Sequence, residues 1–112
     1  TAENSLINAL SITKILPSGT EIMAFYFENK LIKISTTDNL SHSEQIFFDN
    51  DILRCYERSG YDNGKEYFFA YYINDNKIFC KQNKLSGRYL SLDNKEEETI
   101  MLIIEEYLAA IQ

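Results

Sequence analysis

The chain has 112 residues, of which 45% are hydrophobic, and this length fits one domain with one core. Its net charge of −6 argues against general affinity for nucleic acids or anionic membranes, because both are bound through an excess of Lys and Arg. No apolar run reaches the ~18 residues that a membrane-spanning helix needs. We therefore expect a single domain over residues 1–112 that binds neither nucleic acid nor membrane.

The N-terminal segment, residues 2–16, carries its apolar residues on a broad helical stripe. Leu6 and Leu10 share one helical face, whereas Ile12 falls on the opposite side. We expect one continuous helix that ends at the helix-breaking Pro17. The alternative is a short helix up to Leu10 followed by an extended segment.

Two strands and a loop are expected next. Residues 21–28 are apolar on both faces, as in a central strand that is covered on each side. Residues 31–37 alternate, with Ile32 and Ile34 on one face, and form the second arm of a hairpin. The polar residues 36–45 predict a loop.

The strongest strand signal is the stretch 65–81, in which two apolar-aromatic runs flank the turn residues 74–76, Asn-Asp-Asn. Because Asn and Asp tolerate the left-handed conformation of tight turns, this stretch predicts a hairpin. Residues 52–59 fit a strand or a helical turn; a strand is favoured because the loop signal at 61–64 leads directly into the hairpin. Residues 88–92 add a short final strand to the meander.

The C-terminal segment is predicted to be a helix. Asp93 or Asn94 caps its start, and Glu96 and Glu97 place negative charge at the positive end of the helix dipole. We therefore expect an α+β fold with two layers, in which an antiparallel meander of hairpins packs against N- and C-terminal helices. The apolar residues that recur at helical spacing are Ile100, Ile103, Ile104, Tyr107, Leu108 and Ile111.

Few residues of the chain suit catalysis near neutral pH. The one histidine, His42, lies between two serines and is expected to be solvated. Cys55 and Cys80 lie in apolar strand-like runs and are expected to be free thiols, although they could pair if strands 52–58 and 77–82 lie close together. A cysteine nucleophile with His42 as base requires the fold to bring the two together. We expect no enzyme activity and no cofactor.

Metal-binding patterns are also weak. Asp49-Asn50-Asp51 is similar to the start of a calcium-binding loop, but the sixth position is Arg54 and the twelfth is Gly60. No CxxC or HxxxH spacing suits zinc. We interpret residues 49–51 as a turn and expect no metal site.

A basic strip follows the predicted hairpin, at Lys77, Lys81, Lys84 and Arg88. Basic residues interleaved with aromatic ones are typical of nucleic-acid platforms. The overall negative charge opposes that function, so we expect these side chains to solvate an outer strand and to block strand-to-strand aggregation.

Acidic and aromatic residues gather in the middle of the chain. Residues 38–64 carry a charge of −4, whereas residues 65–92 carry +3 and residues 93–112 carry −5. The chain also has eight tyrosines, more than one small core needs. Aromatic side chains ringed by carboxylates are typical of protein-binding surfaces, although a second core layer under the N-terminal helix would also use them. The candidate partner-binding residues are Asp49, Asp51, Glu57, Tyr61, Asp62 and Tyr72.

In size, acidity, aromatic-rich strands and lack of a catalytic set, the whole chain resembles the small immunity proteins that bacteria co-produce with secreted toxins, including those of contact-dependent growth inhibition. The resemblance implies a cytoplasmic inhibitor, a monomer or weak dimer, that covers the active site of a cognate toxin. A basic toxin such as a nuclease fits the acidic charge.

A second class of protein shares the size and the charge. Small acidic chaperones of secreted effectors are dimers that hold a partly unfolded client on an apolar helix face or at a strand edge. A monomer that binds one folded partner favours the inhibitor, and a dimer that binds an extended segment favours the chaperone.

Overall fold

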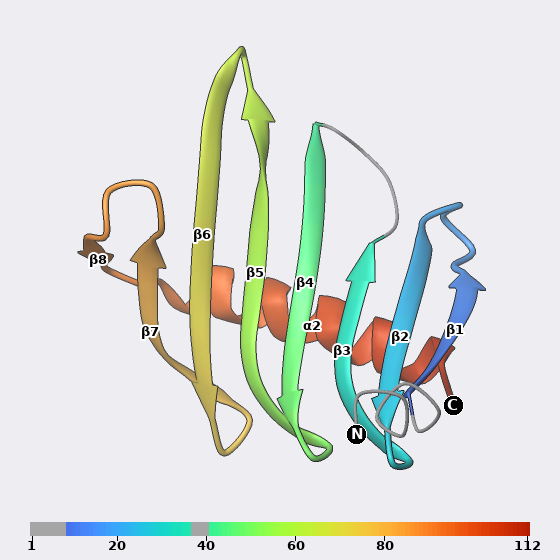
Figure 1. Cartoon of the computed structure of the whole chain (residues 1–112). Coiled ribbons are helices and arrows are strands. Elements are labelled where there is room, and N and C mark those ends of the chain that lie inside the picture. The colour runs from blue at the N-terminus through green and yellow to red at the C-terminus, as the bar shows by residue number, and fades with distance from the viewer. Residues whose placement is uncertain (1–8, 37–40) are drawn as a thin grey trace.

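The computed structural model describes residues 9–36 and 41–112, which form one antiparallel sheet and one long helix (Figure 1). The strands follow one another in space in chain order, so the sheet is a simple meander. The long helix, α2, spans Asn94–Ala110. The strands are β1 (Ala9–Ile15), β2 (Glu21–Phe27), β3 (Lys30–Thr36), β4 (His42–Asp49), β5 (Ile52–Asp62), β6 (Lys65–Asn74), β7 (Lys77–Asn83) and β8 (Tyr89–Leu90).

Four tight turns connect the hairpins of this meander. Each has two central residues with positive φ, between 48° and 79°, which matches the twist of the flanking strands. Asn, Asp and Gly occupy most of these positions because they tolerate this conformation. The predicted central hairpin is confirmed. The turn residues are Glu28-Asn29, Asn50-Asp51, Asn63-Gly64 and Asp75-Asn76.

The predicted N-terminal helix is wrong for the part of it that the structure describes. Residues 9–15 form strand β1, which pairs with β2 along its whole length, from Ala9 opposite Phe27 to Ile15 opposite Glu21. The segment ALSITKI contains three β-branched residues, which favour extended backbone. Residues 2–8 of the predicted helix lie outside the described residues.

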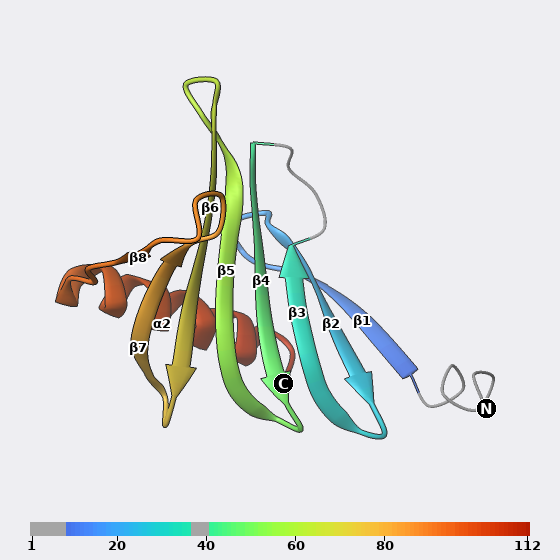
Figure 2. The same cartoon turned by 60° about the vertical axis from the view of Figure 1, so that its left-hand side comes forward.

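Helix α2 lies across one face of the sheet (Figures 1 and 2). Its start is confirmed: the Asp93 side chain accepts a hydrogen bond of 2.7 Å from the Glu96 backbone N–H. Ile100, Ile104 and Tyr107 face the sheet and are buried. The two-layer arrangement is therefore confirmed for the described residues, with one helix in the second layer. No helix of the described residues is long and apolar enough to cross a membrane.

Bulges change the expected side-chain pattern of β3. Phe25 pairs with Lys33 while Tyr26 pairs with Leu31, so Ile32 is an extra residue opposite that step. As a result Leu31 and Ile34 enter the core, whereas Ile32, which alternation placed with Ile34, is exposed. The sequence pattern could not show this register shift.

The loop predicted over residues 36–45 is wrong for Thr36, which ends β3, and for residues 42–45, whereas residues 37–40 lie outside the described residues. Strand β4 begins at His42, so four polar residues that suggested a loop are extended and paired with β5. Glu44 points from this part of β4 into the core and is 6% exposed. Its carboxylate accepts hydrogen bonds from two tyrosine hydroxyls, and these bonds make the burial possible.

Strand β2 is covered on one face only by the elements that the structure describes. Ile22 and Ala24 are fully buried on the α2 side, and Met23 and Phe25 lie half-buried on the other. The expectation of a strand covered on each side is therefore wrong within residues 9–36 and 41–112. We call the face of the sheet opposite α2 the uncovered face.

Candidate partner-binding site

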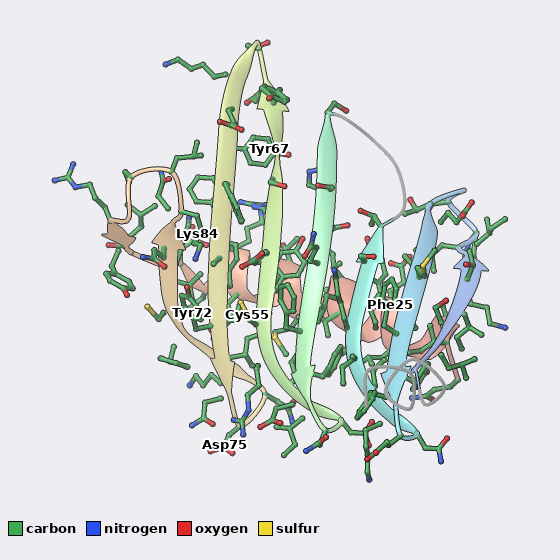
Figure 3. The ribbon with its side chains drawn as sticks, viewed as in Figure 1. Phe25, Cys55, Tyr67, Tyr72, Asp75 and Lys84 are labelled. Atoms are coloured by element: carbon green, nitrogen blue, oxygen red, sulfur yellow. The ribbon has the colours of Figure 1, made fainter. Side chains whose placement is uncertain are left out.

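A row of mainly apolar side chains crosses the middle of the uncovered face (Figure 3). Each member is the register partner of the next, so the row runs from β2 to β7 at right angles to the strands. Phe25, Cys55 and Tyr72 are seen at one height across the sheet in Figure 3. The row consists of Phe25, Lys33, Phe47, Cys55, Tyr72 and Cys80.

Contacts within the sheet hold this row in place. The Lys33 ammonium lies 5.5 Å from the Phe25 ring centroid and 5.8 Å from the Phe47 ring centroid, which is within cation–π range. The Tyr72 hydroxyl donates a hydrogen bond of 2.8 Å to the Gln82 side-chain oxygen. The row is therefore a preorganised surface of aromatic rings, a composition enriched in protein interfaces.

Two of the six candidate partner-binding residues lie on this face. Tyr72 belongs to the row, and Glu57, which is paired with Ala70, lies one row away on β5. The sequence pattern groups these two residues with the other four candidates, because it does not show which face of the sheet α2 covers.

The other four candidates lie at opposite ends of the sheet. Tyr61 and Asp62 end β5 beside its hairpin with β6, whereas Asp49 ends β4 and Asp51 lies in the turn from β4 to β5. At ~3.3 Å per residue, strand β5 separates the two ends by roughly 33 Å. The structure therefore separates these candidates and does not gather them in one cluster.

Asp51 also has a structural role. Its side chain accepts a hydrogen bond of 2.7 Å from the Leu31 backbone N–H and lies 3.6 Å from the Lys30 ammonium. These contacts tie the turn before β5 to the start of β3. Asp49, at the end of β4, is exposed.

The two cysteines both lie in the row but do not pair. Cys55 and Cys80 are free, and β6 separates them, because Tyr72 pairs with both. Two strand spacings, about 10 Å, exceed the reach of a disulfide. Burial and the nearby Glu57 charge raise the pKa of the Cys55 thiol to about 11, so it is protonated at neutral pH.

His42 lies on the α2 side of the sheet, away from Cys55. Its Nδ1 is 2.5 Å from the Tyr67 hydroxyl and its Nε2 is 3.9 Å from the Glu44 carboxylate. The register places His42 opposite Gly60, a residue of the α2 side, and Cys55 on the uncovered face. The structure thus does not bring His42 and Cys55 together.

Glu44 forms a buried polar cluster that the sequence did not reveal. Its carboxylate accepts hydrogen bonds from the hydroxyls of Tyr56 on β5 and Tyr107 on α2. Burial and the Glu44 carboxylate raise the pKa of both hydroxyls above the usual value, so they act as donors at neutral pH. The cluster joins the sheet to the C-terminal half of α2.

Glu96 forms a second polar cluster at the start of α2. It accepts hydrogen bonds from the Lys81 ammonium, at 2.8 and 3.0 Å, and from the Tyr71 hydroxyl, at 2.7 Å. Arg58 Nη2 lies 3.4 Å from the same carboxylate. Lys81 is therefore a largely buried member of this cluster, with a side chain 13% exposed, and the expectation that it solvates an outer strand is wrong.

A cavity of about 650 Å³ opens beside the Arg58 end of this cluster. We call it the upper cavity, because it lies at the end of β4, β5 and β6 that is at the top of Figure 1. Tyr67, labelled in Figure 3, lies in its wall. The lining residues are Ser41, His42, Arg58, Tyr61, Asp62, Lys65, Glu66, Tyr67 and Phe69.

No protein-family model, curated protein sequence or solved structure matches this chain. Among residues 9–36 and 41–112, no group of three or more His, Cys, Asp or Glu side chains could hold a metal ion. The candidate site therefore rests on the geometry of the chain itself.

Proposed function

We propose that this protein is a stoichiometric protein-binding inhibitor, of the type that bacteria use as immunity proteins, and that it neutralises a basic toxin such as a nuclease by covering its active site. The observation that carries the proposal is the uncovered face. Its central row presents Phe25, Phe47 and Tyr72 on a rigid sheet, and no element of the described residues covers them.

The size of the uncovered face suits a protein partner. The row crosses six strands, so its five strand spacings of about 4.8 Å extend over roughly 24 Å. A standard interface buries about 800 Å² on each partner, which corresponds to a patch about as wide as this row is long. An open patch of this extent fits the surface of a folded protein better than a small molecule, which binds in a concave site.

The charge around the face favours a basic partner. Asp49 at the end of β4 and Asp62 at the end of β5 are exposed at opposite ends of the sheet, and Glu57 lies between them on the uncovered face. Acidic groups at the rim of an apolar patch accelerate the association of a positively charged protein. The net charge of −6 acts in the same direction.

Charge reversal at the rim tests this proposal. Asp49→Lys and Asp62→Lys should slow association with the toxin, more strongly at low salt, because the rim charges act over the ~10 Å Debye length. Asp51 is unsuitable, since reversal there also breaks the hydrogen bond from Leu31. Surface plasmon resonance at two salt concentrations measures the rates; Asp75→Lys, in the β6–β7 turn, is the matched control. Unchanged association in both rim variants would exclude these acids from the interface.

The chaperone alternative depends on surfaces that the structure places differently. The apolar face of α2 packs on the sheet, so it is not available for a client. Strand β1 is at the edge of the sheet and exposes Leu10 and Ile15, to 61% and 70%, which suits an added strand. Light scattering separates the two functions: a dimer that carries an extended client would favour the chaperone.

A further inference from the structure

The upper cavity lies apart from the central row on which the proposed inhibitor function rests, and its lining shares only Asp62 with the acidic residues of that proposal. Its lining residues Arg58, Tyr67 and Phe69 lie on the α2 side of the sheet, beyond the point where the N-terminal turn of α2 contacts β6 through Glu96 and Tyr71. In Figure 1 strands β5 and β6 extend well past α2 at this end. Its volume of about 650 Å³ lies within the range of about 300–1,000 Å³ of small-molecule sites.

Arg58 makes the inner wall of the cavity electropositive. Its guanidinium shares the Glu96 carboxylate with Lys81, so two cations face one anion. The contact between Arg58 Nη2 and the Glu96 carboxylate is long, at 3.4 Å, whereas the Lys81 ammonium makes the short contacts with that carboxylate. Arg58 Nε is buried and has no hydrogen-bond partner among the described residues. The guanidinium is therefore incompletely satisfied by the protein. Because Nε itself is buried, an anion in the cavity would bind the exposed third of the Arg58 side chain at its Nη atoms.

Aromatic rings form the side walls. The Tyr67 and Phe69 rings stack with centroids 6.2 Å apart, and the Phe69 ring lies 5.6 Å from the Arg58 guanidinium carbon. The hydrogen bond to His42 Nδ1 fixes the Tyr67 ring. Tyr61, which is 56% exposed, stands at the opening. These walls suit a flat apolar or aromatic body.

The rim limits the charge that the cavity accepts. The lining contains two acidic residues, Asp62 and Glu66, and two basic residues, Lys65 and Arg58, so its formal charges cancel. A doubly charged group such as a phosphate monoester would be repelled by the two rim carboxylates. A singly charged carboxylate can reach Arg58 with less repulsion.

We propose that the upper cavity binds an aromatic monocarboxylate, with its carboxylate on the Arg58 guanidinium and its ring against Tyr61, Tyr67 and Phe69. The carboxylate belongs either to a free small acid or to the C-terminal residue of a polypeptide. This proposal does not depend on the inhibitor function.

The test follows the Arg58 side chain by NMR, because the chain has only three arginines and hence three Nε–H signals. The probes are N-acetylphenylalanine and its uncharged amide, N-acetylphenylalaninamide. The acid should move the Arg58 signal in a saturable way at millimolar concentration and leave those of Arg54 and Arg88 unchanged. An unmoved Arg58 signal, or an equal shift with the amide, would overturn the proposal.

Two variants make the test independent of folding defects. Tyr61→Ala removes an exposed wall and should weaken acid binding about tenfold by loss of ring packing; Tyr89→Ala, at a tyrosine 68% exposed on β8, is the matched control. Arg58→Gln should abolish the difference between acid and amide. If Tyr61→Ala binds the acid as the wild type does, the cavity is not the site.

A third probe identifies the source of the carboxylate. The tetrapeptide Ala-Ala-Ala-Phe carries the same terminal carboxylate on a longer chain. Binding tighter than that of N-acetylphenylalanine would indicate the C-terminus of a polypeptide, whereas weaker binding would indicate a free acid. Both outcomes support the carboxylate site.

Discussion

At the scale of single residues, the buried Glu44 and the partly buried Glu96 join the helix to the sheet. Glu44 holds Tyr56 and Tyr107, and Glu96 holds Lys81 and Tyr71. Such carboxylates are stable in a core only when their hydrogen bonds are satisfied. The sequence did not reveal them, because a Glu in a polar stretch or in a helix cap has an ordinary surface explanation. Their tyrosine partners come from distant parts of the chain.

Replacing Glu44 tests the first cluster. Glu44→Ala should lower the free energy of unfolding by roughly 3 kcal/mol, because two buried hydroxyls lose their acceptor. Urea unfolding followed by circular dichroism measures the loss. Glu106→Ala, at an exposed neighbour of Tyr107, is the control and should be close to neutral. A loss no larger than the control's would show that the cluster contributes little.

Acid titration tests the second cluster. Burial alone would raise the pKa of Glu96, but the hydrogen bonds from Lys81 and Tyr71 and the charges of Lys81 and Arg58 outweigh it and hold the pKa below its usual value of 4.5. A lowered folded-state pKa stabilises the protein above the unfolded-state pKa, and this stability is lost as the pH falls through the folded value.

The expected result is a difference in the acid limb of the stability curve. Wild type should lose stability more steeply than Glu96→Gln as the pH falls below roughly 4.5. Urea midpoints measured from pH 6 downward follow this loss. Glu98→Gln, at an exposed residue of the same turn, should retain the wild-type slope. Parallel curves for wild type and Glu96→Gln would contradict the assignment.

At the scale of elements, the sequence predicts the helices and turns that residues close together in the chain determine. The Asn, Asp and Gly turns and the Asp93 cap specify the central hairpin and α2 without help from distant residues. Strand β1 was mistaken for a helix because its short apolar pattern fits both periods, and pairing with β2 decides between them. Bulges such as that at Ile32 depend on the partner strand and leave no local signal.

Gly60 shows how closely two elements approach. A Cβ there would lie 2.1 Å from the Ser41 carbonyl oxygen, which also accepts a hydrogen bond of 3.0 Å from the Tyr61 backbone N–H. Gly60→Ala should therefore push the start of β4 away from β5 and cost about 2 kcal/mol of stability.

Hydrogen exchange and urea unfolding check this expectation. The Tyr61 amide should lose protection in Gly60→Ala, while amides in the middle of β5 keep theirs. Lys65→Ala, at an exposed residue of the adjoining strand, is the control. Full protection of the Tyr61 amide in Gly60→Ala would show that the contact is not tight.

At the scale of the whole molecule, one sheet separates two kinds of surface. The α2 side holds the core and the upper cavity, and the other side presents the uncovered face with acidic groups at its ends. From the sequence, aromatic and acidic residues could be named as a binding surface, and Glu57 and Tyr72 do share a face. The row that includes Phe25, Lys33 and Phe47 could not be found, because it exists only through the register of neighbouring strands.

Isothermal titration calorimetry of two charged variants with the product of the neighbouring reading frame tests whether the uncovered face is the interface. Tyr72→Glu places a charge in the central row, and Leu102→Glu places one on the outer side of α2, where Leu102 is 65% exposed. We predict one-to-one binding that Tyr72→Glu weakens at least about a hundredfold, as expected for a central interface residue, while Leu102→Glu leaves it unchanged. Wild-type affinity in Tyr72→Glu, or a loss in Leu102→Glu alone, would contradict the assignment of the uncovered face.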